Sequence, residues 1–139
     1  MALPTISPVA DAVVAAVRAC VGTRFRPQGR VPGLGLDCVG VALVAAAAAG
    51  INVPKLPAYS LAGDHECMLD ALLAGMCTAV PVGSPGDLMV FAPAPMRRHL
   101  AVVTGSGLVH AHAGLMRVVE APADPGWKWL SAWRLTGEN

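Results

Sequence analysis

Charged side chains are scarce in this sequence of 139 residues. Asp, Glu, Lys and Arg make up 14% of it, hydrophobic residues make up 55%, and the net charge is +1. Such a chain has no basic stripe to neutralise nucleic-acid phosphates, and it must bury most of its apolar side chains in a core or against partner proteins. We therefore exclude nucleic acid as a partner. We expect one domain over residues 1–139, because this length allows one substantial core and not two.

The sequence also lacks a long apolar run and an export signal. The apolar run Val39–Gly50 covers 12 residues, whereas a helix needs about 20 to cross a bilayer. Near the start of the chain, Pro4, Pro8, Asp11 and Arg18 interrupt the apolar stretch and no basic leader precedes it, unlike in a signal peptide. We expect no membrane span, and a protein made in the cytoplasm without a signal peptide.

The cysteines include no Cys-X-X-Cys pair. Cys20, Cys38, Cys67 and Cys77 are widely spaced, whereas zinc knuckles and redox motifs need close pairs. We expect no disulfide framework, no metal and no cofactor. We interpret Cys20, Cys67 and Cys77 as core residues, because free cysteine is among the most buried residue types.

The apolar patterns predict helices first and strands afterwards. Helices are expected from Ser7 to Gly22, over 39–49 and over 66–73 with a stop at Gly75, and 23–36 reads as an irregular loop. Strands are expected near 87–91, 98–104, 107–113, 116–121 and 127–135. The fold class is therefore α+β, with N-terminal helices packed on an antiparallel sheet of about five strands.

Tryptophans alternate along the last expected strand. Strand geometry puts every second residue on one face, and the following residues share such a face: Trp127, Trp129, Ser131, Trp133 and Leu135. We expect this face to be buried and the tryptophans to serve packing rather than sugar binding.

Cys38 lies where a glycine-rich loop becomes a helix. Its sulfur would lie beside unsatisfied backbone N–H groups and the positive end of the helix dipole, a position that favours the thiolate. A thiolate next to a histidine is an activated nucleophile, and that histidine must come from elsewhere in the fold.

Three histidines fall on the strands beside an expected hairpin. Thr-Gly-Ser-Gly at 104–107 has the composition of a hairpin connection. The resulting register puts His99 opposite His112 and diagonal to His110, with all three rings on one face. If the Cys38 helix packs on this face, the cluster supplies a base and a residue that orients it.

Other interpretations of these residues stay open. A cysteine at the start of an apolar helix is also a common core residue. Three histidines and one cysteine could instead hold zinc, although the spacing matches no finger. His65, between two acidic residues, is expected to be a solvated residue at a helix start.

The segments GTRFRPQGRVPGLGLDCVG, GDLMVF and HLAVVTGSGLVHA together resemble the NlpC/P60 family of cysteine peptidases in order and spacing. The resemblance runs from about Gly22 to Ala113 and implies a papain-like fold. It also implies Cys38 as nucleophile, His99 as base and His110 as the residue that orients His99. Three further residues are auxiliary candidates: His112, Asp37 and Phe25, the last standing beside the position of a family tyrosine.

The same resemblance implies a function. Members cleave peptides of peptidoglycan, near the bond between D-glutamate and a diamino acid, through an acyl-enzyme. Val39, where many members have serine, resembles the branch carried in phage tails or gene-transfer particles. That branch implies local wall digestion, a place in the tail of a virion or phage-like particle, and tail or baseplate proteins as partners. We expect Val53–Pro57 and Ala92–Met96 to bury against them.

Two alternatives belong to other functional classes. The chain could be a catalytically silent structural component of a tail tip with the same fold. It could also be a thiol amidase or acyltransferase, which a hydrophobic groove near Phe25 would favour. An active peptidase should instead hold the Cys38 sulfur within hydrogen-bond reach of a His99 ring nitrogen, and Cys38 should be alkylated faster than the other cysteines.

Overall fold

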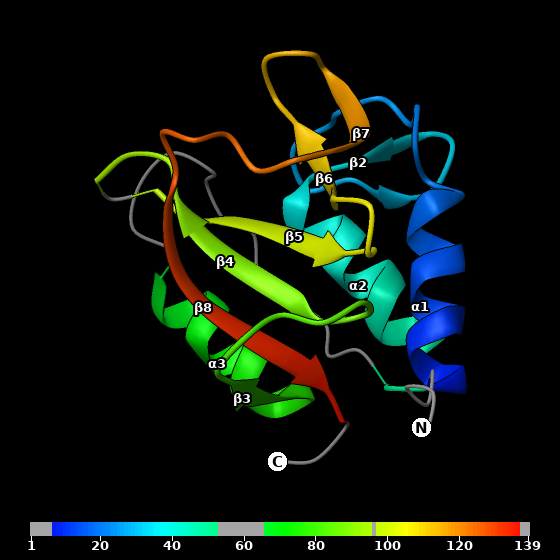
Figure 1. The fold of residues 1–139 in the computed structure, drawn as a ribbon. Coiled ribbons are helices and arrows are strands. Elements are labelled where there is room, and N and C mark those ends of the chain that lie inside the picture. Colours follow the sequence, from blue (N-terminus) through cyan, green and yellow to red (C-terminus); the bar gives the residue numbers. More distant parts are fainter. Residues whose placement is uncertain (1–6, 53–65, 96, 137–139) are drawn as a thin grey trace.

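A computed structural model describes residues 7–52, 66–95 and 97–136 and shows helices packed on one antiparallel sheet (Figure 1). The main sheet has six strands in the order β3-β8-β4-β5-β6-β7, and its neighbouring strands are antiparallel. The α+β class is thus confirmed.

Three helices are described. Helix α1, Pro8–Arg18, starts with Ser7 as N-cap and proline in its first turn, and it buries Val13 and Val17. Helix α2, Cys38–Ala48, is apolar on all sides and correspondingly buried. Helix α3, Glu66–Met76, continues through Gly75, so the expected stop there is wrong.

The strands of the main sheet are β3 (Cys77–Val80), β4 (Leu88–Ala92), β5 (His99–Val103), β6 (Leu108–His112), β7 (Arg117–Ala121) and β8 (Lys128–Leu135). The expected count of five missed β3, because this strand follows α3 with no turn residue between them. The loop at 23–36 also holds a short hairpin of β1 (Arg30–Val31) and β2 (Gly35–Leu36).

The expected burial of the tryptophan face is wrong for Trp129. Its side chain is 44% exposed, while Ala132, expected on the other face, is 1% exposed. The reason is a β-bulge, because the pairing of β4 with β8 shifts between Val90, opposite Ser131, and Phe91, opposite Trp129.

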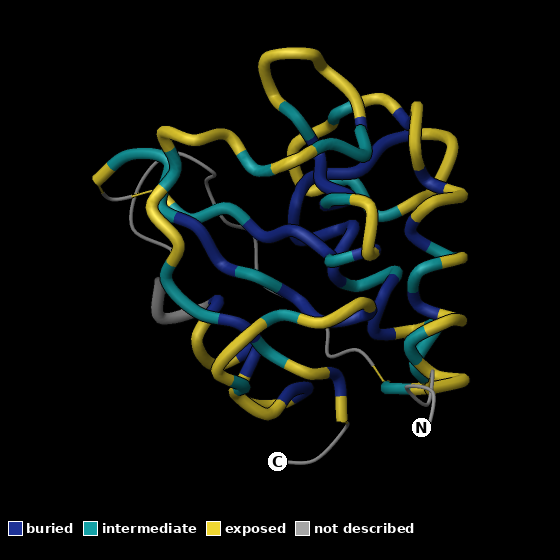
Figure 2. Tube along the Cα trace, viewed as in Figure 1, coloured by how far each residue is buried: buried dark blue, intermediate teal, exposed yellow. Residues whose placement is uncertain are grey.

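The core lies mainly between the helices and one face of the sheet. Helix α2 packs on β5 and β6, and these segments form the buried centre of the molecule (Figure 2). A smaller cluster of Phe91, Ala101 and Leu108, with Trp127 against it, covers the other face. Over the described residues, no helix has the length and apolar character needed to span a membrane.

Candidate active site

Asp37 fixes the start of α2 and the loop before it. Its carboxylate is fully buried; Oδ1 accepts hydrogen bonds from the Gly40 N–H (2.8 Å) and from Arg30 Nη1 (3.0 Å). Oδ2 accepts one from the Gln28 N–H (2.7 Å). These bonds cap the helix and tie the loop to it. Asp37 therefore positions Cys38 from beneath the site and does not line the pocket.

Glycines allow the loop to lie directly on the first turn of α2. A Cβ on Gly40 would stand 2.2 Å from the carbonyl oxygen of Gly29, and a Cβ on Gly29 would stand 2.5 Å from the backbone of Gly35. Side chains do not fit at such distances. This packing holds the N-terminal end of α2, and with it Cys38, at a fixed place beside the sheet.

A pocket of about 200 Å³ brings the predicted site residues together. Its lining residues are Phe25, Cys38, Pro93, Arg97, Arg98, His99, His110, Ala111, His112, Ala113, Gly114 and Trp127. Five of the six candidate site residues named from the sequence line this pocket: Cys38, His99, His110, His112 and Phe25. The sixth candidate, Asp37, does not line it.

His99 and His110 form a hydrogen-bonded pair. His99 Nε2 lies 2.9 Å from His110 Nδ1, and the two rings meet edge to face with centroids 4.9 Å apart. The indole of Trp127 packs on both, at 4.9 and 5.2 Å. Because Nε2 is engaged, Nδ1 is the nitrogen of His99 left to accept a proton from a thiol.

His112 has a different role from the other two histidines. Its Nδ1 accepts a hydrogen bond from the Leu115 N–H (3.0 Å), which holds the turn between β6 and β7. The hairpin at 104–107 is confirmed, but the described pairing of β5 with β6 covers only Val102–Val109 and Val103–Leu108 and does not reach His99 and His112. The diagonal neighbour His110 is therefore the one that contacts His99.

The histidines and α2 lie on opposite sides of the sheet. Leu100 and Val102 pack against α2 in the main core, whereas Ala101 belongs to the small cluster with Trp127. The expectation that the Cys38 helix covers the histidine face is wrong. Cys38 instead enters the pocket from the N-terminal end of the helix, where the backbone N–H of Leu100 acts to lower the pKa of its thiol.

Burial favours the protonated form of the Cys38 thiol. It is 3% exposed, and burial raises its pKa to about 11; the N–H groups of Leu100 and Val39 lower the pKa, and the charge of Asp37 raises it. The helix start was expected to favour the thiolate, whereas desolvation acts on the pKa in the opposite direction and outweighs the donors there.

Burial also keeps the histidine pair neutral. The pKa of His99 is lowered to about 3 and that of His110 to about 4, first by desolvation and then by the neighbouring imidazoles. The raised pKa of the thiol and the lowered pKa values of the two imidazoles both favour the uncharged groups over an ion pair, and a neutral imidazole can accept a proton.

Cys20 and Cys77 lie outside this pocket. Cys20 and Cys77 are buried free thiols, 1% and 5% exposed, which confirms their assignment to the core. His65 and the side chain of Cys67 lie outside the described residues. Within the described ranges, no three metal-ligating side chains are grouped to hold a metal ion.

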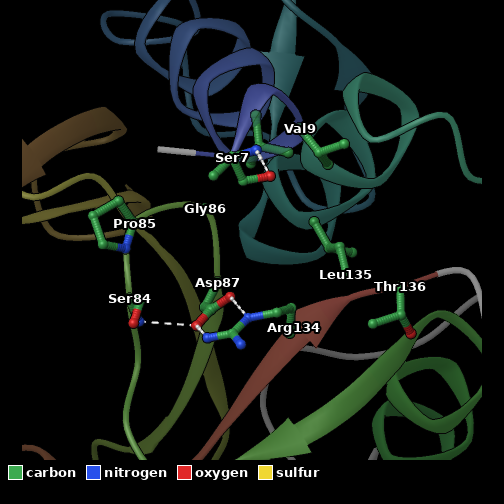
Figure 3. Close-up of a pocket in the computed structure, with 11 residues that line it drawn as sticks. Ser7, Val9, Ser84, Pro85, Gly86, Asp87, Arg134, Leu135 and Thr136 are labelled. Atoms are coloured by element: carbon green, nitrogen blue, oxygen red, sulfur yellow. Dashed lines mark hydrogen bonds and ion pairs between the residues drawn. The ribbon is translucent and has the colours of Figure 1, made fainter. Parts of the chain in front are cut away.

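A larger hollow, of about 670 Å³, lies between α1, the turn before β4 and the end of β8 (Figure 3). Asp87 occupies its centre, where its carboxylate accepts from Arg134 Nε (3.1 Å) and Nη2 (3.0 Å) and from the Ser84 N–H (2.8 Å). Of the histidines and cysteines whose side chains the structure describes, none lines it. This ion pair joins the start of β4 to β8, so we assign it a structural role.

Sequence reasoning missed two kinds of site residue. Trp127 was assigned to a strand face, but it precedes β8 and packs on the histidines. Arg97 and Arg98 line the pocket directly before His99 in the chain. Their adjacency to the base was a visible signal.

Solved structures of several proteins resemble this one, although no family model and no curated protein matches the sequence. NlpC2 from Trichomonas vaginalis superposes with a TM-score of 0.71 at 15% identity, over 96% of this chain and 48% of that protein. The NlpC/p60 domain of the peptidoglycan hydrolase SagA superposes with a TM-score of 0.63 at 22% identity, over 91% of this chain and 98% of that chain. RipD from Mycobacterium tuberculosis superposes with a TM-score of 0.62 at 19% identity, over 94% of this chain and 100% of that chain. RipD is a non-catalytic NlpC/p60 domain protein adapted to peptidoglycan binding. This chain thus spans about half the length of NlpC2, and at these identities the likeness establishes the fold.

Proposed function

Because this chain has the NlpC/P60 fold, we propose that it is a peptidoglycan endopeptidase with Cys38 as nucleophile, His99 as base and His110 as the residue that orients His99. One observation carries the proposal. His99 Nε2 and His110 Nδ1 are hydrogen-bonded at 2.9 Å in the pocket that Cys38 lines, which leaves His99 Nδ1 for the thiol.

The neutral resting state determines how the reaction must start. Transfer of the Cys38 proton to His99 is unfavourable by itself, because the pKa of the thiol is raised to about 11 and that of the imidazole is lowered to about 3. The proton therefore moves to Nδ1 as the sulfur forms its bond to the substrate carbonyl. Backbone N–H groups at the helix start, those of Cys38 and Val39, are suited to stabilise the oxyanion.

The second half of the reaction uses the same histidines. His99, now protonated, donates through Nε2 to His110 Nδ1 and gives its Nδ1 proton to the leaving amine as the carbon–nitrogen bond breaks. The thioester that remains is hydrolysed by water, with His99 again as base. His110 keeps the ring of His99 in one orientation through both steps.

Digestion of purified sacculi tests this proposal. Wild type should release muropeptides that mass spectrometry identifies as products of stem-peptide cleavage, and Cys38→Ala should release none. Cys20→Ala is a matched control, since Cys20 is buried as Cys38 is but lies outside the pocket. Equal product lists from wild type and Cys38→Ala would contradict catalysis by Cys38.

One observation favours a second candidate, a non-catalytic wall-binding or structural component. The Cys38 sulfur is 3% exposed and its pKa is raised to about 11. Such a site can bind a peptide without cleaving it. In the digestion experiment, this candidate predicts that wild type binds sacculi and releases nothing.

We further propose that the protein works in the tail of a phage or phage-like particle, with tail or baseplate proteins as partners. Large apolar side chains exposed on its surface support this: Leu34 is 71% exposed, Val82 70% and Met116 56%. The segments first expected to meet such partners are less informative, because Val53–Pro57 and Met96 lie outside the described residues. Co-sedimentation with purified particles tests the proposal, and a soluble monomer absent from every particle fraction would overturn it.

A further inference from the structure

The candidate active-site pocket has a fixed positive charge. Among the described residues that line it, Arg97 and Arg98 are cationic and none is acidic. A guanidinium keeps its charge at any pH that a protein tolerates, whereas burial lowers the pKa of His99 to about 3 and that of His110 to about 4, so these two rings are neutral at pH 7. The two arginines are therefore the permanent charges that a bound substrate meets.

The carboxylate next to Cys38 does not offset this charge. Asp37 is fully buried, and its oxygens accept hydrogen bonds from the Gly40 and Gln28 N–H groups and from the Arg30 guanidinium. Its own cation, Arg30, does not line the pocket. The charge of Asp37 is thus balanced beneath the site, and the charge of Arg97 and Arg98 is presented to the ligand.

The two arginines have different surroundings. Arg98 is half-buried, and its Nη1 donates to the carbonyl oxygen of Arg97 at 2.9 Å, a bond that braces the chain before β5. Arg97 is exposed, and no described residue forms an ion pair with it. Its backbone is held by a hydrogen bond from its N–H to the Ala94 carbonyl (3.1 Å). Arg97 therefore has its backbone held two residues before His99, and its guanidinium can engage a ligand in the pocket.

We propose that Arg97 binds a carboxylate of the peptide substrate beside the bond that Cys38 attacks, so that the site selects peptides with a free carboxylate there over the corresponding carboxamides. This inference rests on the proposed function and names its substrate class. A guanidinium forms two parallel hydrogen bonds to a carboxylate and is geometrically matched to it. Conversion of the carboxylate to an amide removes the charge and one acceptor oxygen.

Kinetics on a pair of synthetic peptides test the proposal. The pair is L-alanyl-γ-D-glutamyl-L-lysine and the same peptide with the D-glutamyl α-carboxylate converted to an amide. Wild type should cleave the acid with a kcat/KM about 10- to 100-fold above that for the amide, the range expected for a charge-assisted contact. Arg97→Gln should lose this preference by raising KM for the acid, with kcat little changed and the amide little affected.

A matched variant and a binding measurement complete the design. Lys128→Gln removes a positive charge from an exposed strand residue that does not line the pocket, and it should keep the preference. Calorimetry with Cys38→Ala should show tighter binding of the acid than of the amide, and Cys38→Ala/Arg97→Gln should bind both alike.

The two proposals fail in different ways. If wild type cleaves neither peptide but Cys38→Ala binds the acid more tightly, the carboxylate site stands and the proposed catalysis fails. Arg97 does not select a carboxylate if wild type cleaves both peptides equally or if Cys38→Ala binds both equally. The same conclusion follows if Arg97→Gln lowers kcat/KM by the same factor for both peptides.

Discussion

At the residue scale, burial beside the sheet raises the pKa of Cys38 and lowers that of His99, and both shifts favour the uncharged side chain. The loop-to-helix position of Cys38 and the histidine cluster could be predicted from sequence, because glycine spacing and strand alternation leave a pattern. The charge state could not. It depends on how much water the folded chain excludes from the sulfur, a quantity set by residues distant in sequence, such as Leu100 and Trp127.

Alkylation of Cys38 should be slow at neutral pH and accelerate towards strongly alkaline pH. The reactive species is the thiolate. For a thiol whose pKa is raised to about 11, the thiolate fraction rises roughly tenfold with each unit of increasing pH, as long as the pH stays below that value. We expect the iodoacetamide rate, followed by mass spectrometry of the Cys38 peptide, to show no plateau between pH 6 and 9. A plateau near pH 6 would indicate a thiolate–imidazolium pair and contradict the neutral site.

Stability should fall on acidification through the titration of the histidine pair. Unfolded histidines bind protons near pH 6.5, whereas folded His99 and His110 do so only near their lowered pKa values, about 3 and about 4. Between these limits the unfolded state binds more protons than the folded state, so the free energy of unfolding rises with pH. The stability that the neutral histidines contribute therefore decreases as the pH falls below about 6.5. We expect a loss on the order of a few kcal/mol by pH 4.

Urea unfolding at a series of pH values measures this loss. The double variant His99→Gln/His110→Gln should show a shallower slope between pH 6.5 and 4, because its site has no imidazole to protonate. Parallel pH profiles for wild type and the double variant would show that other groups cause the acid sensitivity.

At the element scale, helix α2 and the loop before it act as one unit that holds Cys38. Asp37 supplies the polar contacts of this unit, and Gly29, Gly35 and Gly40 allow the close approach of its backbones. The sequence predicted an irregular loop with many glycines, but not which glycine meets which. That information depends on the short β1–β2 hairpin, whose two-residue strands are too brief to leave an alternation pattern.

Gly40→Ala should destabilise the fold and displace Cys38. The new Cβ would stand 2.2 Å from the Gly29 carbonyl oxygen, and overpacking of this kind typically costs about 1–3 kcal/mol. Gly75→Ala is the matched control: it lies in α3 with no atom within 4 Å of its added Cβ. In a helix this change should be neutral or stabilising by up to about 1 kcal/mol. Equal urea midpoints for the two variants would show that the loop moves away from α2 without cost.

At the scale of the whole molecule, the layered arrangement was predictable and the edges of the sheet were not. Turn residues separate β4 to β7, so these strands were located from sequence within one or two residues. Strand β3 was missed because it follows α3 directly, and the face of β8 was misassigned because a bulge interrupts its alternation. In both cases the deciding contact is with a strand far away in the chain, since β8 pairs with both β3 and β4.

The position of β8 between β3 and β4 also constrains how the protein can be made. β8 is the last strand of the sheet to leave the ribosome, yet it is the only described strand that joins β3 to the rest. Until it emerges, β4 keeps one unpaired edge and Asp87 has no Arg134 to neutralise it. Between the synthesis of β4 and that of β8, the nascent chain therefore carries an open sheet edge, which is a state prone to pairing with other chains. The emergence of β8, rather than collapse around α2, is then the step that closes the sheet.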